Sequence, residues 1–303
     1  MQDSSHSHPA PQAQLQAPPA LSAEPALLPE PRTLPYTAVM AWLKIGGELF
    51  INQFFRWIGI YLLIVLLTIV GSFVSGALTT GLLAMSNIPL PLALEPLFNG
   101  QLIPLMTLLV WVFGLLGTAL YTWFSAGLFI GADQVARGHK LQVGHLFAGF
   151  GQRFIPLTQL AVITFVFTYA FNWLLKLPDT SLVLSNVMSP DELMQNSPTR
   201  MLNKFLTGSI ELQTVIELLS ALFLQLIFWF SIPLVALTDL PVWQALKQSL
   251  KGSVRNALTL TGYLVAAFVV TSLGGMALGI GLLIVLPWLT CSEYSAYRQV
   301  YTT

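Results

Sequence analysis

Long apolar stretches separated by short polar ones dominate the pattern of hydrophobic and polar positions along this chain. A helix needs about 20 mostly apolar residues to cross the roughly 30 Å hydrocarbon core of a bilayer. Its backbone polar groups must also find their partners within the segment. The pattern therefore predicts an all-α integral membrane protein with six transmembrane helices. Their expected ranges are about 57–82, 102–130, 154–175, 212–237, 258–273 and 278–297.

The last two predicted spans share one apolar run from Ala257 to Tyr297. A single helix over this run would be longer than an ordinary bilayer requires, so the chain should turn within it. We place the turn at Gly274 and Gly275, because adjacent glycines allow the backbone to reverse direction.

A segment with regularly spaced polar residues precedes the first and fifth predicted spans, and a shorter one containing Arg153 precedes the third. A spacing of four residues places each polar row on one face of a helix. The rows are Lys44, Glu48, Asn52 and Arg56 in the first segment, and Lys247, Lys251 and Arg255 in the last. Val39, Trp42, Leu49 and Phe50 form the opposite, apolar face of the first helix. These patterns predict amphipathic helices that lie in the membrane plane.

Cations on such helices are expected to contact phospholipid headgroups. The predicted headgroup contacts are Lys44, Arg56, Arg153, Lys247, Lys251 and Arg255. Two interpretations stay open: the cations bind anionic phospholipid specifically, or their charges only fix the topology of the chain.

Each of these segments is followed by two predicted spans, which return the chain to the same side of the membrane. The layout predicts three parallel hairpin repeats over about 36–139, 140–240 and 241–303. Lys and Arg are unevenly divided between the two sides: three of the 13, Lys176, Arg200 and Lys204, lie opposite both termini. The excess of positive charge beside the termini predicts that both are cytoplasmic.

Composition agrees with the membrane class. The chain has 303 residues, 55% hydrophobic and 9% charged, whereas soluble domains have about 25% charged residues. The net charge is zero, so no basic field would attract nucleic acid. One cysteine, Cys291, excludes an intrachain disulfide, and the four histidines show no metal-binding spacing, so no metal or cofactor is expected.

Prolines are frequent in the first 35 residues, and each fixes a backbone angle and removes a hydrogen-bond donor. We therefore predict a disordered cytoplasmic tail over 1–35 and a membrane domain over 36–303. The tail lacks the charged start and apolar core of a signal peptide.

Three polar residues fall inside predicted spans: Asn172, Glu217 and Gln225. Polar groups at membrane depth can line a transport path. They can also form hydrogen bonds between helices, which is the interpretation that we favour.

Carboxylates lie near the ends of alternate predicted spans, at Asp133, Asp239 and Glu293. We expect them to form ion pairs with Arg137, Lys247 or Arg298 and so to hold the repeats together.

No phosphate loop and no GxSxG nucleophile motif occurs in the sequence, which favours a non-enzymatic protein.

Four short motifs, "FSAGLFIGADQVARG", "HLFAGFGQRF", "SIPLVALTDLPVWQALKQSLKGSVRN" and "VLPWLTCSEYSAYRQVY", carry a family resemblance. Residues 41–301 resemble an uncharacterised family of proteobacterial inner-membrane proteins. The layout is also similar to the membrane domains of some glycerophosphodiester phosphodiesterases. The resemblance implies a bacterial inner-membrane location but no activity, because no soluble phosphodiesterase domain occurs in the sequence.

Two functional hypotheses follow. The first is a scaffold or a protein of envelope and lipid homeostasis, with anionic phospholipids as its partners. The alternative is a transporter or channel for a lipid or small solute. Protein partners and a homo-oligomeric state stay open.

Overall fold

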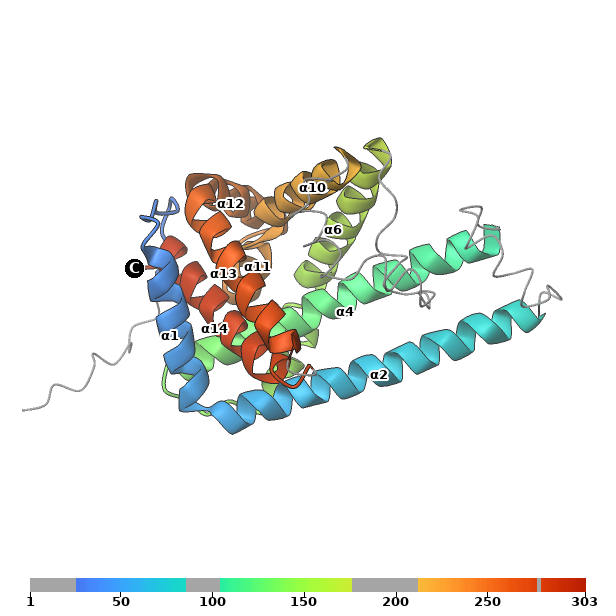
Figure 1. Cartoon of the computed structure of the whole chain (residues 1–303), viewed down its shortest axis with the longest axis horizontal. Helices are drawn as coiled ribbons and strands as arrows, with labels where there is room; N and C mark the ends of the chain where they lie inside the picture. Colours follow the sequence, from blue (N-terminus) through green and yellow to red (C-terminus); the bar gives the residue numbers. More distant parts are fainter. Residues whose placement is uncertain (1–25, 86–103, 176–211, 277–278) are drawn as a thin grey trace, which may run out of the picture.

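The computed structural model describes residues 26–85, 104–175, 212–276 and 279–303, which form helices and their connections (Figure 1). In chain order the helices are α1 (Ala38–Asn52), α2 (Phe54–Met85), α4 (Pro104–Ala136), α5 (Val143–Leu146), the 3-10 turn η1 (Ala148–Phe150), α6 (Phe154–Leu174), α10 (Leu212–Phe228), α11 (Ser231–Leu237), α12 (Val242–Arg255), α13 (Ala257–Met276) and α14 (Leu282–Tyr301). The described residues contain no strand beyond an isolated bridge between Leu27 and Thr302. The all-α prediction is therefore confirmed for this part of the chain.

Five helical segments are long and apolar enough to cross a membrane. They are Phe54–Gly81, Trp111–Ala136, Phe154–Leu174, Leu219–Leu237 and Ala257–Met276. Each coincides with one of the first five predicted spans, although the second ends about one and a half turns later than expected. The chain is thus a multi-pass membrane protein by the composition and length of its helices. The sixth predicted span falls on α14, which is not among these segments, and it stays a prediction.

The surface of α2 is suited to contact with lipid. From Leu62 onward most of its large apolar side chains are exposed, including Leu66, Ile69 and Phe73. Its hydroxyl groups are satisfied within the helix: Thr68 Oγ1 donates to Ile64 O at 2.8 Å, and Ser72 Oγ donates to Thr68 O at 2.9 Å. An apolar face of this length would be unstable in water but is favourable in a bilayer.

The helix α14 lies beside α1 (Figure 1), and α13, α2 and α4 also contact it. Its side chains Cys291, Tyr294, Tyr297 and Tyr301 are buried. Hydrogen bonds fix it to its neighbours, since Tyr263 Oη of α13 donates to Leu289 O at 3.0 Å. The core therefore gathers around a helix that carries more polar groups than the five apolar segments.

The predicted fourth span is divided between α10 and α11 by a break at residues 229–230. Pro233 explains the break, because it has no N–H to donate and its ring disfavours a continuous helix one turn earlier. The side chain of Ser249, on α12, forms hydrogen bonds with backbone groups beside the break. Its hydroxyl accepts from Phe230 N at 3.1 Å and donates to Ile227 O at 2.9 Å. Polar backbone groups exposed by the break are thereby satisfied.

The run that we expected to turn at Gly274 and Gly275 does divide into two helices, but the turn lies further along the chain. Both glycines remain in α13. Gly279, with a φ of 76°, supplies the left-handed conformation before α14. Gly274 instead allows close packing, because a Cβ there would lie 3.2 Å from the Gly281 carbonyl carbon.

The three-repeat organisation stays a prediction. Single helices of similar length, α1 and α12, begin the first and third units. The second unit begins with the four-residue α5 and η1 instead. Parts of the connections within each predicted hairpin, at residues 86–103, 176–211 and 277–278, lie outside the described residues.

Candidate functional site

Among the described helices, α1 and α14 share the most extensive contact, and two glycines of α1 allow it. A Cβ on Gly46 would lie 2.5 Å from Ser292 Cα, and one on Gly47 would lie 3.3 Å from Trp288 Nε1. Small residues let helix backbones approach closely. The approach allows Trp288 Nε1 to donate to Leu43 O at 2.9 Å, and it allows Trp42 Nε1 to donate to Gln299 Oε1 at 3.1 Å.

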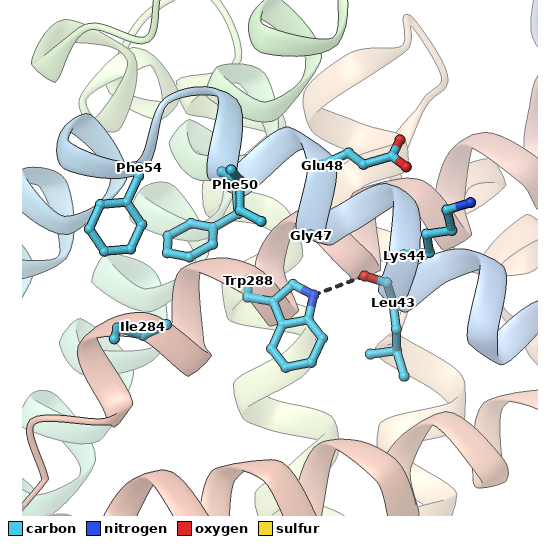
Figure 2. A pocket seen from close by; sticks show the side chains of 9 residues that line it. Leu43, Lys44, Gly47, Glu48, Phe50, Phe54, Ile284 and Trp288 are labelled. Carbon is cyan, nitrogen blue, oxygen red and sulfur yellow. Dashed lines mark hydrogen bonds between the residues drawn. The ribbon is translucent and has the colours of Figure 1, made fainter.

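An open groove of about 460 Å³ lies along this pairing (Figure 2). Its apolar walls are formed by Leu43, Phe50, Ile51, Phe54, Ile284 and Trp288. The rings of Phe50 and Phe54 contact each other with centroids 5.1 Å apart. The volume and the apolar lining fit part of a hydrocarbon chain or another elongated apolar group.

Lys44 and Glu48 also border the groove, but their charged ends point away from the rings of Phe50 and Phe54 (Figure 2). They lie one turn apart on α1 and both are exposed. Among the described residues no ion pair or hydrogen bond engages either side chain. The groove is thus an apolar surface with one cation and one anion exposed beside it.

The apolar face predicted for α1 does not lie free for the membrane. Trp42 is fully buried, and Val39 and Phe50 are buried with it. Trp42 contacts Tyr263 of α13 with ring centroids 6.0 Å apart. The prediction of a membrane-facing apolar side was therefore wrong for α1, because α13 and α14 cover that face.

Residues 26–35 correct the predicted boundary of the disordered tail. Leu28 N donates to Tyr301 O at 2.8 Å, and Arg32 N donates to Val300 O at 2.9 Å. Asn256 binds the same segment, since its Nδ2 donates to Arg32 O at 2.8 Å. We call residues 26–35 the strap; it joins the N-terminal part of the chain to its C-terminus. Residues 1–25 of the predicted tail lie outside the described residues.

Glu30 of the strap engages two of the cations that we assigned to lipid headgroups. Lys251 Nζ lies 2.6 Å from Glu30 Oε1, and Arg255 Nη2 lies 2.8 Å from Glu30 Oε2. The hydrogen bonds from Lys251 and Arg255 hold the pKa of the Glu30 carboxyl below its usual range. Both cations therefore have an intrachain partner, which the sequence spacing did not indicate.

The other predicted headgroup cations differ in their surroundings. Arg153 pairs with Asp239, although we expected Lys247 among the candidates for that carboxylate. Arg56 donates to Gln53 Oε1 at 2.9 Å. Lys247 lies over the ring of Trp243, 5.4 Å from its centroid. Of this set, Lys44 and Lys247 are the ones without a side-chain oxygen partner in the described parts of the chain.

The expected clamp at Asp133 is confirmed. Arg137 Nε donates to Asp133 Oδ2 at 2.7 Å, and Tyr294 Oη donates to Oδ1 at 2.8 Å. Arg298 lies 3.6 Å from the same Oδ1. The buried carboxylate thereby fixes the end of α4 to α14. The third predicted carboxylate, Glu293, has no ion-pair partner in the part of the chain that the structure describes.

The predicted intramembrane polar site stays a prediction. Asn172 is half-buried on α6 and Gln225 is exposed on α10. Neither side chain has a hydrogen bond within the described structure. α6 and α10 meet instead through aromatic rings, with Phe171 and Phe223 centroids 5.3 Å apart. Glu217 lies in α10, but its side chain is outside what the structure describes.

Trp288 and the glycine pair are the site residues that sequence reasoning missed. The signal for them was present, because adjacent glycines inside an otherwise regular helix indicate a close approach by another element. No spacing rule, however, identifies the partner, which lies more than two hundred residues away.

No protein-family description, curated protein or solved structure matches this chain.

We expect Gly46→Ala to destabilise the protein by about 1–3 kcal/mol, because the added methyl group collides with the backbone of α14. Gly59→Ala, at a position where a Cβ meets nothing within 4 Å, is the matched control and should be neutral or slightly stabilising. Thermal unfolding in detergent measures both. Equal effects of the two substitutions would contradict the close helix approach.

The lowered pKa of Glu30 predicts a pH-dependent strap. A depressed native pKa gives stability that is fully present above the ordinary pKa and lost as the pH falls through the native pKa. Acidification should therefore speed hydrogen exchange at Leu28 and Arg32, after correction for intrinsic rates. Glu30→Gln should have the same effect at neutral pH.

The matched control for this measurement is Glu48→Gln, which removes an exposed carboxylate from another surface. It should leave exchange at Leu28 and Arg32 unchanged. If Glu30→Gln also left that exchange unchanged, the ion pairs would not hold the strap.

Proposed function

We propose that this chain is a non-enzymatic membrane protein that binds a phospholipid of the surrounding bilayer in the groove between α1 and α14. The observation that carries the proposal is the groove itself, with apolar walls and Lys44 at its edge. An acyl chain would lie against Phe50, Phe54 and Trp288. The lipid phosphate would accept hydrogen bonds from the Lys44 ammonium group. Such a protein would serve as a scaffold or in envelope and lipid homeostasis.

A second surface supports contact with the anionic phospholipid that we expected. On α12 the side chains of Trp243, Leu250 and Val254 are exposed beside Lys247. Tryptophan favours the level of the headgroups, and a lysine can extend its ammonium to a phosphate there. We infer that this side of α12 lies in the membrane interface as an amphipathic helix, with Lys247 as its cation.

The strap supports an even number of membrane crossings. Thr303 N donates to Ala26 O at 3.2 Å, so the C-terminus lies beside the strap on one side of the membrane. Five crossings would leave the two ends on opposite sides. A sixth crossing by α14 resolves the difference, as in the six-span layout that we propose.

The location proposed for the protein is the bacterial inner membrane, with both termini in the cytoplasm. The distribution of Lys and Arg and the family resemblance support it. A transporter built on Asn172, Glu217 and Gln225 has less support, because neither Asn172 nor Gln225 has a hydrogen bond within the described structure.

The lipid proposal predicts that native mass spectrometry will find a phospholipid retained by the protein after its release from nanodiscs. Lys44→Gln should weaken retention about fivefold, since one lysine at a headgroup contributes about 1 kcal/mol. Lys140→Gln removes an exposed cation that does not line the groove and is the matched control. The proposal fails if the wild-type protein retains no defined lipid, or if both substitutions act alike.

The topology proposal predicts that reporters fused before Met1 and after Thr303 will both report the cytoplasm. A fluorescent protein should fluoresce at both ends, and alkaline phosphatase should be inactive at both. Activity of the phosphatase at one end only would rule out an even number of crossings.

A further inference from the structure

Lys251 and Arg255 of α12 already hold an anion, the carboxylate of Glu30 in the strap. Lys251 Nζ lies 2.6 Å from Glu30 Oε1, and Arg255 Nη2 lies 2.8 Å from Glu30 Oε2, so each cation binds one oxygen. A phosphate group likewise offers neighbouring oxygens to lysine and arginine side chains. The two cations are therefore arranged as an anion site, which the strap fills from within the chain.

This anion site borders the face of α12 that we place in the membrane interface. That face consists of four exposed residues, Trp243, Lys247, Leu250 and Val254. Lys251 follows Lys247 by one helical turn, and Arg255 follows Lys251 by another, so both lie along its edge. Long cationic side chains extend to phosphates at the headgroup level while their stems stay beside apolar residues. The position of the site thus favours a lipid phosphate over a soluble one.

The ion pairs that hold Glu30 are open to competition. The Glu30 side chain is 58% exposed, and those of Lys251 and Arg255 are 42% and 37% exposed. Ion pairs this exposed contribute little to stability, because water and salt screen them. An anionic leaflet strengthens binding by about fivefold for each lysine or arginine beside it. Its phosphates are also held close to the site, whereas a diffusing anion is dilute.

Protons are poor competitors for the same contact at neutral pH. The hydrogen bonds from Lys251 and Arg255 hold the pKa of the Glu30 carboxyl below its usual range, so the group stays ionised. Glu30 therefore leaves the two cations when another anion takes its place.

We propose that Lys251 and Arg255 form a binding site for the phosphate of an anionic phospholipid, and that Glu30 of the strap occupies this site until such a lipid displaces it. This inference rests on the interfacial position proposed for α12 and not on the groove between α1 and α14. The lipid and Glu30 exclude each other from the two cations. Linkage then requires each to weaken the binding of the other by the same factor.

Displacement of Glu30 loosens one end of the strap and leaves the other attached. Leu34 N donates to Asn256 Oδ1 at 2.8 Å, and this neutral partner does not bind a phosphate in preference to the strap. Leu28 N donates to Tyr301 O at 2.8 Å and lies two residues before Glu30, at the end that the ion pairs secure. The exchange rates of the Leu28 and Leu34 amides therefore distinguish a local opening from a general loosening of the chain.

The test places the full chain in nanodiscs of phosphatidylcholine, with or without phosphatidylglycerol of matched acyl chains. Hydrogen exchange resolved to single amides reports the state of the strap. We expect phosphatidylglycerol to speed exchange at Leu28 severalfold and to leave Leu34 unchanged. Glu30→Gln should exchange fast at Leu28 in both nanodiscs, because no carboxylate remains to be displaced. Glu48→Gln, the matched control, should respond to phosphatidylglycerol as the wild-type protein does.

Lipid retention gives the reciprocal measurement. Glu30→Gln raises the net charge of the site by one, so native mass spectrometry should find phosphatidylglycerol retained about fivefold more strongly than by the wild-type protein. Lys44→Gln changes a cation beside the groove and should leave the response of Leu28 to phosphatidylglycerol unchanged.

The outcomes separate this site from the groove. Equal exchange at Leu28 in the two nanodiscs would overturn the inference, while the groove is judged separately by lipid retention in Lys44→Gln. A response that persists in Glu30→Gln, or that extends to Leu34, would show that the lipid does not act by displacing Glu30. Equal acceleration by soluble glycerophosphoglycerol in phosphatidylcholine nanodiscs would assign the site to a free phosphate ester and overturn the lipid.

Discussion

The close approach of α1 to α14 at Gly46 is the contact on which the rest of the structure depends. It brings the backbone of α1 against Ser292 and places Trp288 within hydrogen-bonding distance of Leu43 O. It also buries Trp42, whose ring then contacts Tyr263 of α13. The groove is a consequence of the same packing, since a helix pair this close leaves space only where the side chains diverge, near Phe50 and Ile284. A larger residue at position 46 would therefore change the fold and the groove together.

The strap shows why a row of cations is a poor guide to what those cations bind. Lys251 and Arg255 have the spacing of a headgroup-binding face, yet Glu30 reaches both. An intrachain carboxylate has a high effective concentration and competes well with any diffusing anion. Its exposed ion pairs are individually weak, and the strap is held as much by its backbone bonds to Tyr301 and Val300. For Lys44 and Lys247 headgroup contact stays a prediction, because no side-chain carboxylate of the described structure reaches them.

Hydropathy predicted five of the helical spans because each segment must be long and apolar enough to cross the bilayer on its own. No comparable local pattern in the sequence indicates which distant segments will pack together. The contacts of Glu30 with Lys251 and of Leu43 with Trp288 join residues more than two hundred positions apart, and either end alone looks like an ordinary surface residue. Pro233 partly indicated the break at residues 229–230. Nothing in the sequence indicated that Ser249 would bond to the backbone groups exposed there. Asp133 was the exception, because its partner Arg137 lies one turn away on the same helix. The apolar face of α1 was misassigned for a similar reason: periodicity shows that a face is apolar, not whether protein or lipid covers it.

Charge placement, more than charge number, distinguishes the groove from the rest of the surface. Elsewhere in the described structure carboxylates such as Glu30, Asp133 and Asp239 are held against cations of the chain itself. Glu30 and Asp239 each join two segments in this way, and Asp133 does so through Tyr294 and Arg298. At the groove edge, Lys44 and Glu48 are left unpaired although they could reach each other. The cations that hold the strap and Asp133 are used within the fold, whereas the two charges of α1 stay exposed to whatever surrounds the protein.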